Sequence, residues 1–350
     1  QALSGYSLGE ADLLRRAMGK KIKSEMDAQR VRFVEGALKN GLTKELADEI
    51  FDLLAKFADY GFNKSHAAAY ALVAYQTAYL KANYTVEFLA ASMALDMDNT
   101  DKLSEFRREA ERLGIRVEPP SINRSGVSFE VDHDGKGRGV IRYALAAIKG
   151  VGRQVVESIV SARGDKPFTS LADFASRINP RLVNKRTLEA LIAAGAFDEL
   201  EPDRARATAA IDAMMALAAR TAAAASDGQA DIFGGLAAGP ETLRIPPYEP
   251  WPPAVRLQKE YDAVGFFLSG HPLDGYEEML GRLRVQRWVD FAKAVKAGAT
   301  MGRLAATVLD RTERRTKSGN KMGIVTLSDQ TGQFEAIVFS EGLQRFRDFL

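Results

Sequence analysis

At 350 residues the chain has room for about two to four domains, and its formal net charge of +2 excludes a uniformly basic coat for nucleic acid. It contains no cysteine, which excludes disulfides and thiolate metal sites, and its three histidines leave little for a metal centre. Any nucleic-acid site must therefore be a local basic patch.

The same composition gives an expectation about location. The sequence holds no run of about 18 apolar residues, so we expect no membrane span. The absence of cysteine fits a reducing cytosol, and we expect a cytoplasmic protein. It starts with neither an initiator methionine nor a signal peptide, and it stops inside an apolar helical pattern. We therefore expect a piece of a larger protein.

Residues 1–114 are predicted to be helical. Apolar residues recur at helical spacing, and each run is bounded by a capping residue or a glycine. The expected helices span residues 24–40, 43–61, 65–82, 85–96 and 100–113. Asp96 and Asp98 have the spacing of a metal pair, but they follow a helix rather than a strand, and the pattern favours turn and capping chemistry.

Two basic connections in this region are candidate anion sites. Four cations surround one predicted helix end: Arg15, Arg16, Lys20 and Lys21. Cations there favour the helix dipole, but adjacent arginines point about 100° apart and suit several phosphate oxygens. A glycine turn also leads into a helix start with Lys64 and His66. Taken singly, either could be a solvated surface.

Residues 5–21 and 60–71 closely resemble the fingers domain of bacterial replicative DNA polymerase III alpha subunits, and the similarity continues to residue 350. The resemblance implies that Arg15 and Arg16 contact the triphosphate of the incoming nucleotide. It places Lys20, Lys21, Lys64 and His66 on the same basic surface. It also implies that the Mg²⁺ ions of the intact enzyme are held by palm aspartates upstream, so we expect this piece to bind no metal and to be inactive alone.

Residues 115–144 are predicted to form a short strand and a hairpin around a turn at 134–137, with His133 exposed beside the turn. A helix-hairpin-helix pattern follows at residues 145–159. Glycines let the backbone approach a phosphate, and flanking cations add charge. Its DNA-contact candidates are Lys149, Gly150, Val151, Gly152 and Arg153. An ordinary tight turn is the alternative.

A second half at residues 171–197 lacks the Gly-x-Gly hairpin, and we expect a structural partner that adds phosphate contacts through Lys185 and Arg186. An alanine-rich helix over 204–225 then leads to a short peptide between glycines, before a proline-rich linker. Alone, the apolar pair Ile232 and Phe233 is typical of a loop folded onto the core. With the resemblance, the peptide is similar to the sliding-clamp-binding motif, whose members here are Gln229, Asp231, Ile232 and Phe233.

From residue 299 the pattern changes to strands at 301–308, 324–327 and 334–339, followed by a helix from Glu341. A basic turn at 311–321 joins the first two. This order fits the first part of an oligonucleotide-binding (OB) barrel. The candidate contacts to single-stranded template are Arg314, Arg315, Lys317 and Lys321. A solvated hairpin is the alternative, because no aromatic platform is evident among these strands, and His271 upstream is expected to be structural.

We therefore predict a mainly α, multidomain fold. Its parts are a helical fingers domain (1–114), a strand and hairpin connector (115–144), a tandem helix-hairpin-helix domain (145–203), a segment with the alanine-rich helix, clamp-binding peptide and linker (204–256), a helical connector (257–298) and part of an OB-like domain (299–350).

The resemblance implies template-directed addition of deoxynucleotides to a primer 3′ end. The implied partners are primer-template DNA, deoxynucleoside triphosphates, the sliding clamp (beta subunit) and other replicase subunits, with no membrane. An alternative is a non-catalytic DNA-binding adaptor that recruits the clamp. A helix-hairpin-helix repair protein would leave the matches at 5–21 and 60–71 without an explanation.

Overall fold

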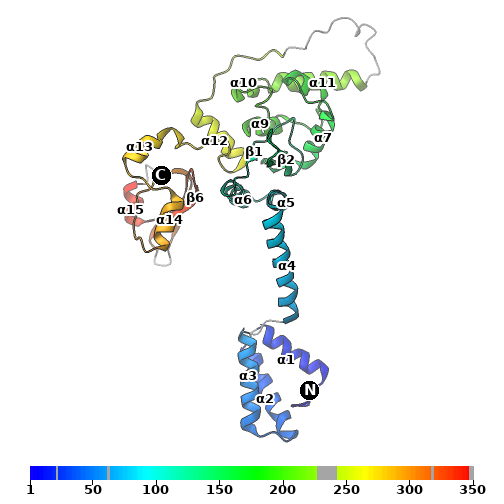
Figure 1. Ribbon diagram of the computed structural model, residues 1–350, viewed down its shortest axis with the longest axis vertical. Coiled ribbons are helices and arrows are strands. Elements are labelled where there is room, and N and C mark those ends of the chain that lie inside the picture. Colours follow the sequence, from blue (N-terminus) through cyan, green and yellow to red (C-terminus); the bar gives the residue numbers. More distant parts are fainter. Residues whose placement is uncertain (21–22, 61–63, 227–242, 317–318, 347–350) are drawn as a thin grey trace. The chain divides into compact units, whose positions relative to one another are not determined.

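The computed structural model describes residues 1–20, 23–60, 64–226, 243–316 and 319–346 (Figure 1). The chain divides into two compact units, Gln1–Leu80 and Lys81–Leu350. Among the described residues helix predominates, and the strands form two sheets of three strands each. The predicted fold class, mainly α and multidomain, is confirmed. Within the same residues, no helix is long and apolar enough to cross a membrane.

The first unit is built around three aromatic side chains, Tyr6, Phe33 and Phe51, which are all buried. Its helices are α1 (Leu8–Lys20), α2 (Lys23–Lys39), α3 (Lys44–Tyr60) and most of α4 (Lys64–Asn83). The bounds of α2, α3 and α4 agree closely with the helices predicted at 24–40, 43–61 and 65–82. Apolar residues at helical spacing explain the packing of α2 on α3, because the spacing gathers them on one face of each helix.

The second unit begins with two helices that the sequence assigned to the fingers. These are α5 (Thr85–Leu95) and α6 (Thr100–Arg112). Leu89, Met93 and Leu103 are fully buried and belong to the same core as the helices that follow. The compact bodies therefore divide at Leu80 rather than at residue 114, because the apolar faces of α5 and α6 pack onto the next sheet and helices.

That sheet consists of β1 (Val117–Glu118), β2 (Glu130–His133) and β3 (Gly139–Arg142). β3 lies in the middle, parallel to β1 and antiparallel to β2. The turn between β2 and β3 is held by the carboxylate of Asp134, which accepts N–H groups from Lys136 and Arg138. The predicted hairpin is thus present, and His133 is exposed beside its turn.

The helix-hairpin-helix region follows and shares this core. Its elements are η1 (Leu145–Ala147), α7 (Arg153–Arg163), α8 (Leu171–Arg177), α9 (Lys185–Ala193), α10 (Arg204–Ala209) and α11 (Ile211–Ser226). The chain then returns through α12 (Pro253–Val264), and α12 lies beside the helical body in Figure 1. Ala263 and Val264 at the end of α12 are buried in the shared core. Residues beyond the linker thus complete this body.

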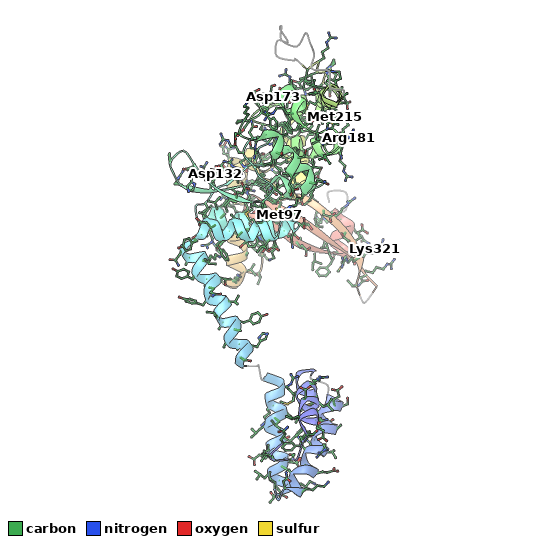
Figure 2. All side chains as sticks on the ribbon, turned by 90° about the vertical axis from the view of Figure 1, so that its right-hand side faces the viewer. Met97, Asp132, Asp173, Arg181, Met215 and Lys321 are labelled. Carbon is green, nitrogen blue, oxygen red and sulfur yellow. The ribbon has the colours of Figure 1, made fainter. Side chains whose placement is uncertain are left out.

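The last part of the chain forms an antiparallel sheet with short helices. It comprises η2 (Asp274–Tyr276), α13 (Glu277–Arg282), α14 (Trp288–Lys296), β4 (Thr307–Arg315), β5 (Lys321–Asp329), β6 (Gly332–Phe339) and α15 (Ser340–Phe346). β5 lies between the other two strands. Trp288 stacks on Phe334 with ring centroids 4.3 Å apart, which attaches α14 to the sheet. Lys321 starts β5 at the end next to the hairpin turn (Figure 2).

The first strand of this sheet differs from the prediction. The strand expected at 301–308 instead begins at Thr307 and continues to Arg315, into the first residues of the predicted basic turn. β4 is an edge strand with polar residues on both faces, so its sequence has no apolar alternation, and pairing with β5 makes it a strand. The OB assignment remains a prediction, since only three strands are described here.

A buried ion network joins α10 to α12. Arg204 and Glu260 have side chains 3% and 0% exposed, and their Nη1 and Oε2 atoms lie 3.0 Å apart. Arg204 also binds both carboxylate oxygens of Asp198. The other oxygen of Glu260 accepts the N–H groups of Leu268 and Ser269, both at 2.7 Å. Burial opposes the charge on Arg204, but its bonds to Asp198 and Glu260 raise its pKa overall. The return of α12 therefore depends on this network.

We predict that Glu260→Gln lowers the free energy of unfolding by roughly 3–5 kcal/mol, because it leaves a buried guanidinium without one of its two carboxylates. Urea denaturation followed by circular dichroism measures the change. The control is Glu278→Gln, since Glu278 and its partner Arg282 are 83% and 77% exposed. We expect a loss of less than about 1 kcal/mol there. Equal, small losses in both variants would contradict a central role for the network.

Candidate functional site

The two arginines of α1 converge on one acid. Arg15 and Arg16, with side chains 74% and 63% exposed, both pair with Asp12, at 2.7 and 2.9 Å. The sequence argument predicted that the two adjacent side chains point in different directions, but their guanidinium groups meet at the same carboxylate. Their side chains reach back three and four residues, onto neighbouring positions of the helix surface. The hydrogen bond from Arg15, with the charge of both arginines, lowers the pKa of Asp12. An anion bound by this fork competes with Asp12.

The other predicted cations of the first unit are only partly covered. Lys20 ends α1 and Lys64 begins α4, but their side chains, like all of Lys21, lie outside the described residues. His66 is exposed in the first turn of α4 and stacks on Tyr70, with ring centroids 4.4 Å apart. The assignment of these residues to one basic surface stays a prediction.

The first hairpin has the backbone geometry that its sequence predicted. Gly150 has φ +80°, a left-handed conformation that favours glycine, and Val151 is buried as the hairpin's apolar anchor. Gly152 is the N-cap of α7, and Gly150 and Gly152 are both exposed. The first N–H groups of an α-helix have no partner within the helix, so the start of α7 presents donors to an anion. Arg153 is 64% exposed at this end and lies 3.7 Å from Glu157.

The connection between α8 and α9, which we call the second hairpin although it lacks the Gly-x-Gly sequence, separates the two cations that the sequence placed together. Asn184 caps α9 by accepting the N–H of Thr187. Lys185 turns toward α11 and pairs with Asp212 at 2.9 Å, and that hydrogen bond raises the pKa of the lysine. Arg186 turns toward the first hairpin, where its Nε would be 4.0 Å from a Cβ added to Gly150. The structure thus joins Arg186, and not Lys185, to the glycine hairpin.

Two residues that lie beside the first hairpin were not predicted from the sequence. Trp251 and Lys259 share with Lys149, Gly150 and Arg186 the lining of a groove of about 540 Å³. They follow the proline-rich linker, far along the chain from the hairpins. A tryptophan in a polar, proline-rich stretch was the available signal, but its neighbours in space could not be deduced without the position of α12.

The sheet carries the remaining basic candidates. Arg314 lies on β4 opposite Met322 of β5, and Met322 in turn lies opposite Phe339 of β6, so all three share one face. Phe339 is 67% exposed. An exposed aromatic side chain therefore lies on the same face as Arg314, with Met322 between them, although the sequence showed no platform. Arg315 of β4 and Lys321 of β5 lie opposite each other in the strand register at the end of the sheet. Lys317 lies outside the described residues.

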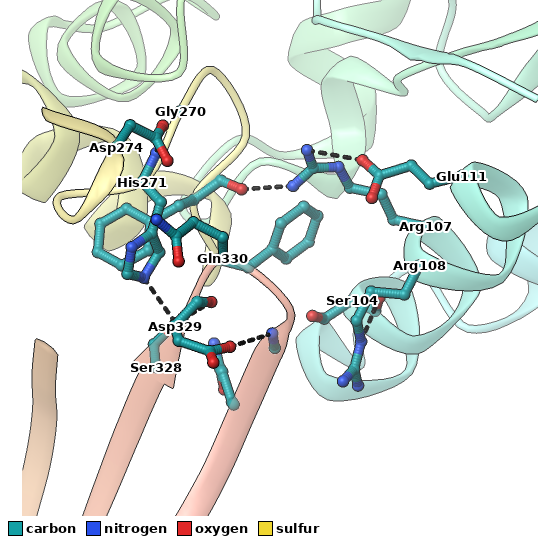
Figure 3. A pocket seen from close by; sticks show the side chains of 14 residues that line it. Ser104, Arg107, Arg108, Glu111, Gly270, His271, Asp274, Ser328, Asp329 and Gln330 are labelled. Atoms are coloured by element: carbon teal, nitrogen blue, oxygen red, sulfur yellow. Dashed lines mark hydrogen bonds and ion pairs between the residues drawn. The ribbon is translucent and has the colours of Figure 1, made fainter. Parts of the chain in front are cut away.

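His271 has a structural role at a polar joint between α6, the segment after α12 and the β5–β6 turn (Figure 3). Its Nδ1 accepts the N–H of Leu273, and its Nε2 lies 3.1 Å from the hydroxyl of Ser328. Burial lowers the pKa of His271. Asp329 beside it accepts the N–H of Trp288. These partners explain the histidine as a contact between segments, in agreement with its prediction.

Within the described part of the chain, no three carboxylate, imidazole or thiol side chains come together as a metal site would require. Asp96 ends α5 as its C-cap, with its carbonyl accepting the N–H of Asn99, which fits the turn and capping interpretation. The predicted clamp-binding residues, Gln229 to Phe233, lie outside the described residues.

Comparison with known proteins adds direct evidence of relationship. Residues 1–41 match the family model of the bacterial DNA polymerase III alpha subunit finger domain, and residues 114–207 match a helix-hairpin-helix motif. The chain is 49% identical to DNA polymerase III subunit alpha of Caulobacter vibrioides, 44% to that of Escherichia coli K12 and 46% to that of Neisseria meningitidis serogroup A. Each match covers 100% of this chain and 30% of the relative.

The chain thus spans less than a third of the length of these relatives, and every part of it is matched. The finger-domain model covers the arginine pair of α1, and the helix-hairpin-helix model covers both hairpins. Over its whole length the chain is therefore similar to one segment of the bacterial DNA polymerase III alpha subunits.

Proposed function

We propose that this chain is the part of a cytoplasmic replicative DNA polymerase that faces the incoming nucleotide, holds the DNA and attaches to the sliding clamp. The parent protein would add deoxynucleotides to a primer 3′ end as directed by a template. The observation that carries the proposal is the similarity to DNA polymerase III alpha subunits, at 44% and 49% identity, over the full length of the chain. The two Mg²⁺ ions of such a reaction would be held by clustered acids in other parts of the parent protein.

The fingers would bind the triphosphate of the incoming nucleotide through Arg15 and Arg16. Both guanidinium groups are exposed and close together on α1, and their ion pairs with Asp12 are exposed, so a triphosphate could displace that carboxylate at little cost. Lys20, Lys21, Lys64 and His66 remain candidates for the same surface.

The parent protein, assayed with a primed template, should extend the primer. Changing Arg15→Ala together with Arg16→Ala should raise the KM for deoxynucleotides by about tenfold or more, with a smaller change in the Kd for primer-template. Steady-state primer extension and a DNA titration measure the two constants. A larger effect on DNA affinity would assign the arginines to DNA. A parent protein that extends no primer would favour the adaptor hypothesis.

Duplex DNA would be held by the first hairpin, where exposed glycines let a phosphate approach the donors at the start of α7. Val151 anchors this turn in the core, and Lys149 and Arg153 add charge at its two sides. Such contacts read no sequence, which suits a protein that must bind all of a template. Single-stranded template would pass the sheet face with Arg314 and Phe339, with Arg315, Lys317 and Lys321 at its end.

Gly152→Ala should leave the fold intact, because the φ of Gly152 is −74° and an added Cβ meets nothing closer than 4.0 Å. Its affinity for a primer-template duplex should nevertheless fall by about tenfold, because the methyl group stands where the phosphate approaches. Fluorescence anisotropy at fixed salt measures the affinity. The matched control is Gly135→Ala in the β2–β3 turn, where an added Cβ meets nothing within 4 Å. A folded Gly152→Ala protein with unchanged affinity would refute the hairpin assignment.

Clamp attachment would be provided by Gln229, Asp231, Ile232 and Phe233. The segments on either side support this proposal. α11 packs on α8 and α9, and Leu243 and Ile245 pack against the same core. Both ends of residues 227–242 are thus anchored on the body that carries the hairpins, so a clamp bound to this peptide would be tethered close to the DNA.

Phe233→Ala should abolish binding to the sliding clamp, since an aromatic anchor supplies much of the apolar contact of such a peptide. Calorimetric titration of the clamp checks this, with duplex binding measured in parallel and expected to stay the same. Leu236→Ala, in the same segment but outside the motif, is the control. Clamp affinity retained by Phe233→Ala would place the contact elsewhere.

A further inference from the structure

The groove beside the first hairpin joins three segments of the chain. Lys149 and Gly150 come from the hairpin, Arg186 from the start of α9, and Trp251 and Lys259 from the segment that returns after the linker. Its volume is about 540 Å³, and alanines form much of its wall. The groove is therefore contiguous with the surface proposed above for duplex DNA.

The charges that line this groove are mostly positive and unpaired. Lys149, Arg186 and Lys259 are all exposed, and among the described residues none of them forms an ion pair with a carboxylate. The neighbouring Lys185, by contrast, is paired with Asp212. Two acids, Glu189 and Asp262, also line the groove, and Asp262 accepts a hydrogen bond from the amide of Gln258. Three cations against two acids leave a net positive site for an anion.

Trp251 holds the lysine of this group in place. The Nζ atom of Lys259 lies 4.7 Å from the centre of the Trp251 ring, in a cation–π contact. A lysine chain is flexible in solution, so a fixed position reduces the entropy lost when its ammonium group binds a ligand. Trp251 is therefore a positioning residue, and Lys259 is the residue that would contact the ligand.

The walls of the groove are held together by the backbone and by the buried network. The N–H of Lys149 donates to the carbonyl of Ala263 at 2.8 Å, which attaches the hairpin to the end of α12. One turn earlier in α12, Glu260 binds Arg204. The cations therefore belong to a preformed site, in which ligand binding requires little rearrangement.

We infer that this groove binds a backbone phosphate of the same DNA strand that the first hairpin contacts, with Lys259 as a DNA contact positioned by Trp251. The inference rests on the proposed duplex binding and extends it to residues beyond the linker. A phosphodiester fits because the site is cationic and opens beside the exposed Gly150. DNA is then held by chain segments on both sides of residues 227–242.

The test uses the 350-residue chain and a primer-template duplex in anisotropy titrations at several salt concentrations. Lys259→Gln should weaken binding about three- to tenfold and reduce the slope of log K against log salt by about 1, as expected for one lost phosphate contact. The matched control is Lys166→Gln. Lys166 is exposed beyond the C-terminal end of α7, the opposite end from the hairpin. An unchanged affinity and slope for Lys259→Gln overturn the inference.

The positioning role of Trp251 has its own readout. Trp251→Phe should keep most of the affinity, while Trp251→Leu should weaken binding and reduce the salt slope as Lys259→Gln does. In a Trp288→Phe background, Trp251 is the one tryptophan of the chain, and its fluorescence should change on adding duplex. A response to inorganic phosphate but not to duplex would assign the groove to free phosphate and overturn the DNA contact.

The two proposals can fail separately. If Gly152→Ala weakens duplex binding and Lys259→Gln does not, the hairpin assignment stands and the groove assignment falls. If the chain without substitutions binds no duplex at all, the hairpin assignment and the groove assignment are both rejected. Loss of affinity in both variants, with the two controls unchanged, supports both.

Discussion

The second unit depends on one buried ion pair, that of Arg204 with Glu260. A charge so far from water is tolerated only with a partner, and here each group has several. Glu260 also accepts the N–H groups of Leu268 and Ser269, while Arg204 also binds Asp198. Because the two charged residues lie on opposite sides of the linker, the pair requires the chain to return to the helical body.

The return of the chain through α12 supports the first hairpin and connects the helical body to the sheet. The carbonyl of Ala263 receives the N–H of Lys149, so the end of α12 supports the glycine hairpin directly. The segment after α12 continues to His271, whose contact with Ser328 joins it to the sheet. Helical body, linker return and sheet are therefore connected through hydrogen bonds of buried polar groups, which demand a specific geometry and so specify one arrangement.

The structure also sorts the basic residues by their partners. Arg15 and Arg16 share Asp12, and Lys185 is paired with Asp212. The cations of the groove beside the first hairpin have no carboxylate partner among the described residues. Exposed ion pairs contribute little to stability, so a bound phosphate could displace them, but an unpaired cation offers its full charge without that competition. This difference favours Lys149 and Arg186 over Lys185 as primary DNA contacts.

The sequence by itself determined the helices, the β2–β3 turn and the first hairpin, because helical periodicity and the glycines at 150 and 152 are local signals. It also supported the family. It misplaced β4, whose polar faces carry no alternation and whose strand exists through pairing with β5. Only the tertiary structure decided that α5 and α6 join the second unit, that Arg15 and Arg16 meet on Asp12, and that Trp251 and Lys259 lie beside Gly150. These are contacts between surfaces, set by burial and charge pairing over long separations, and a local pattern does not encode them.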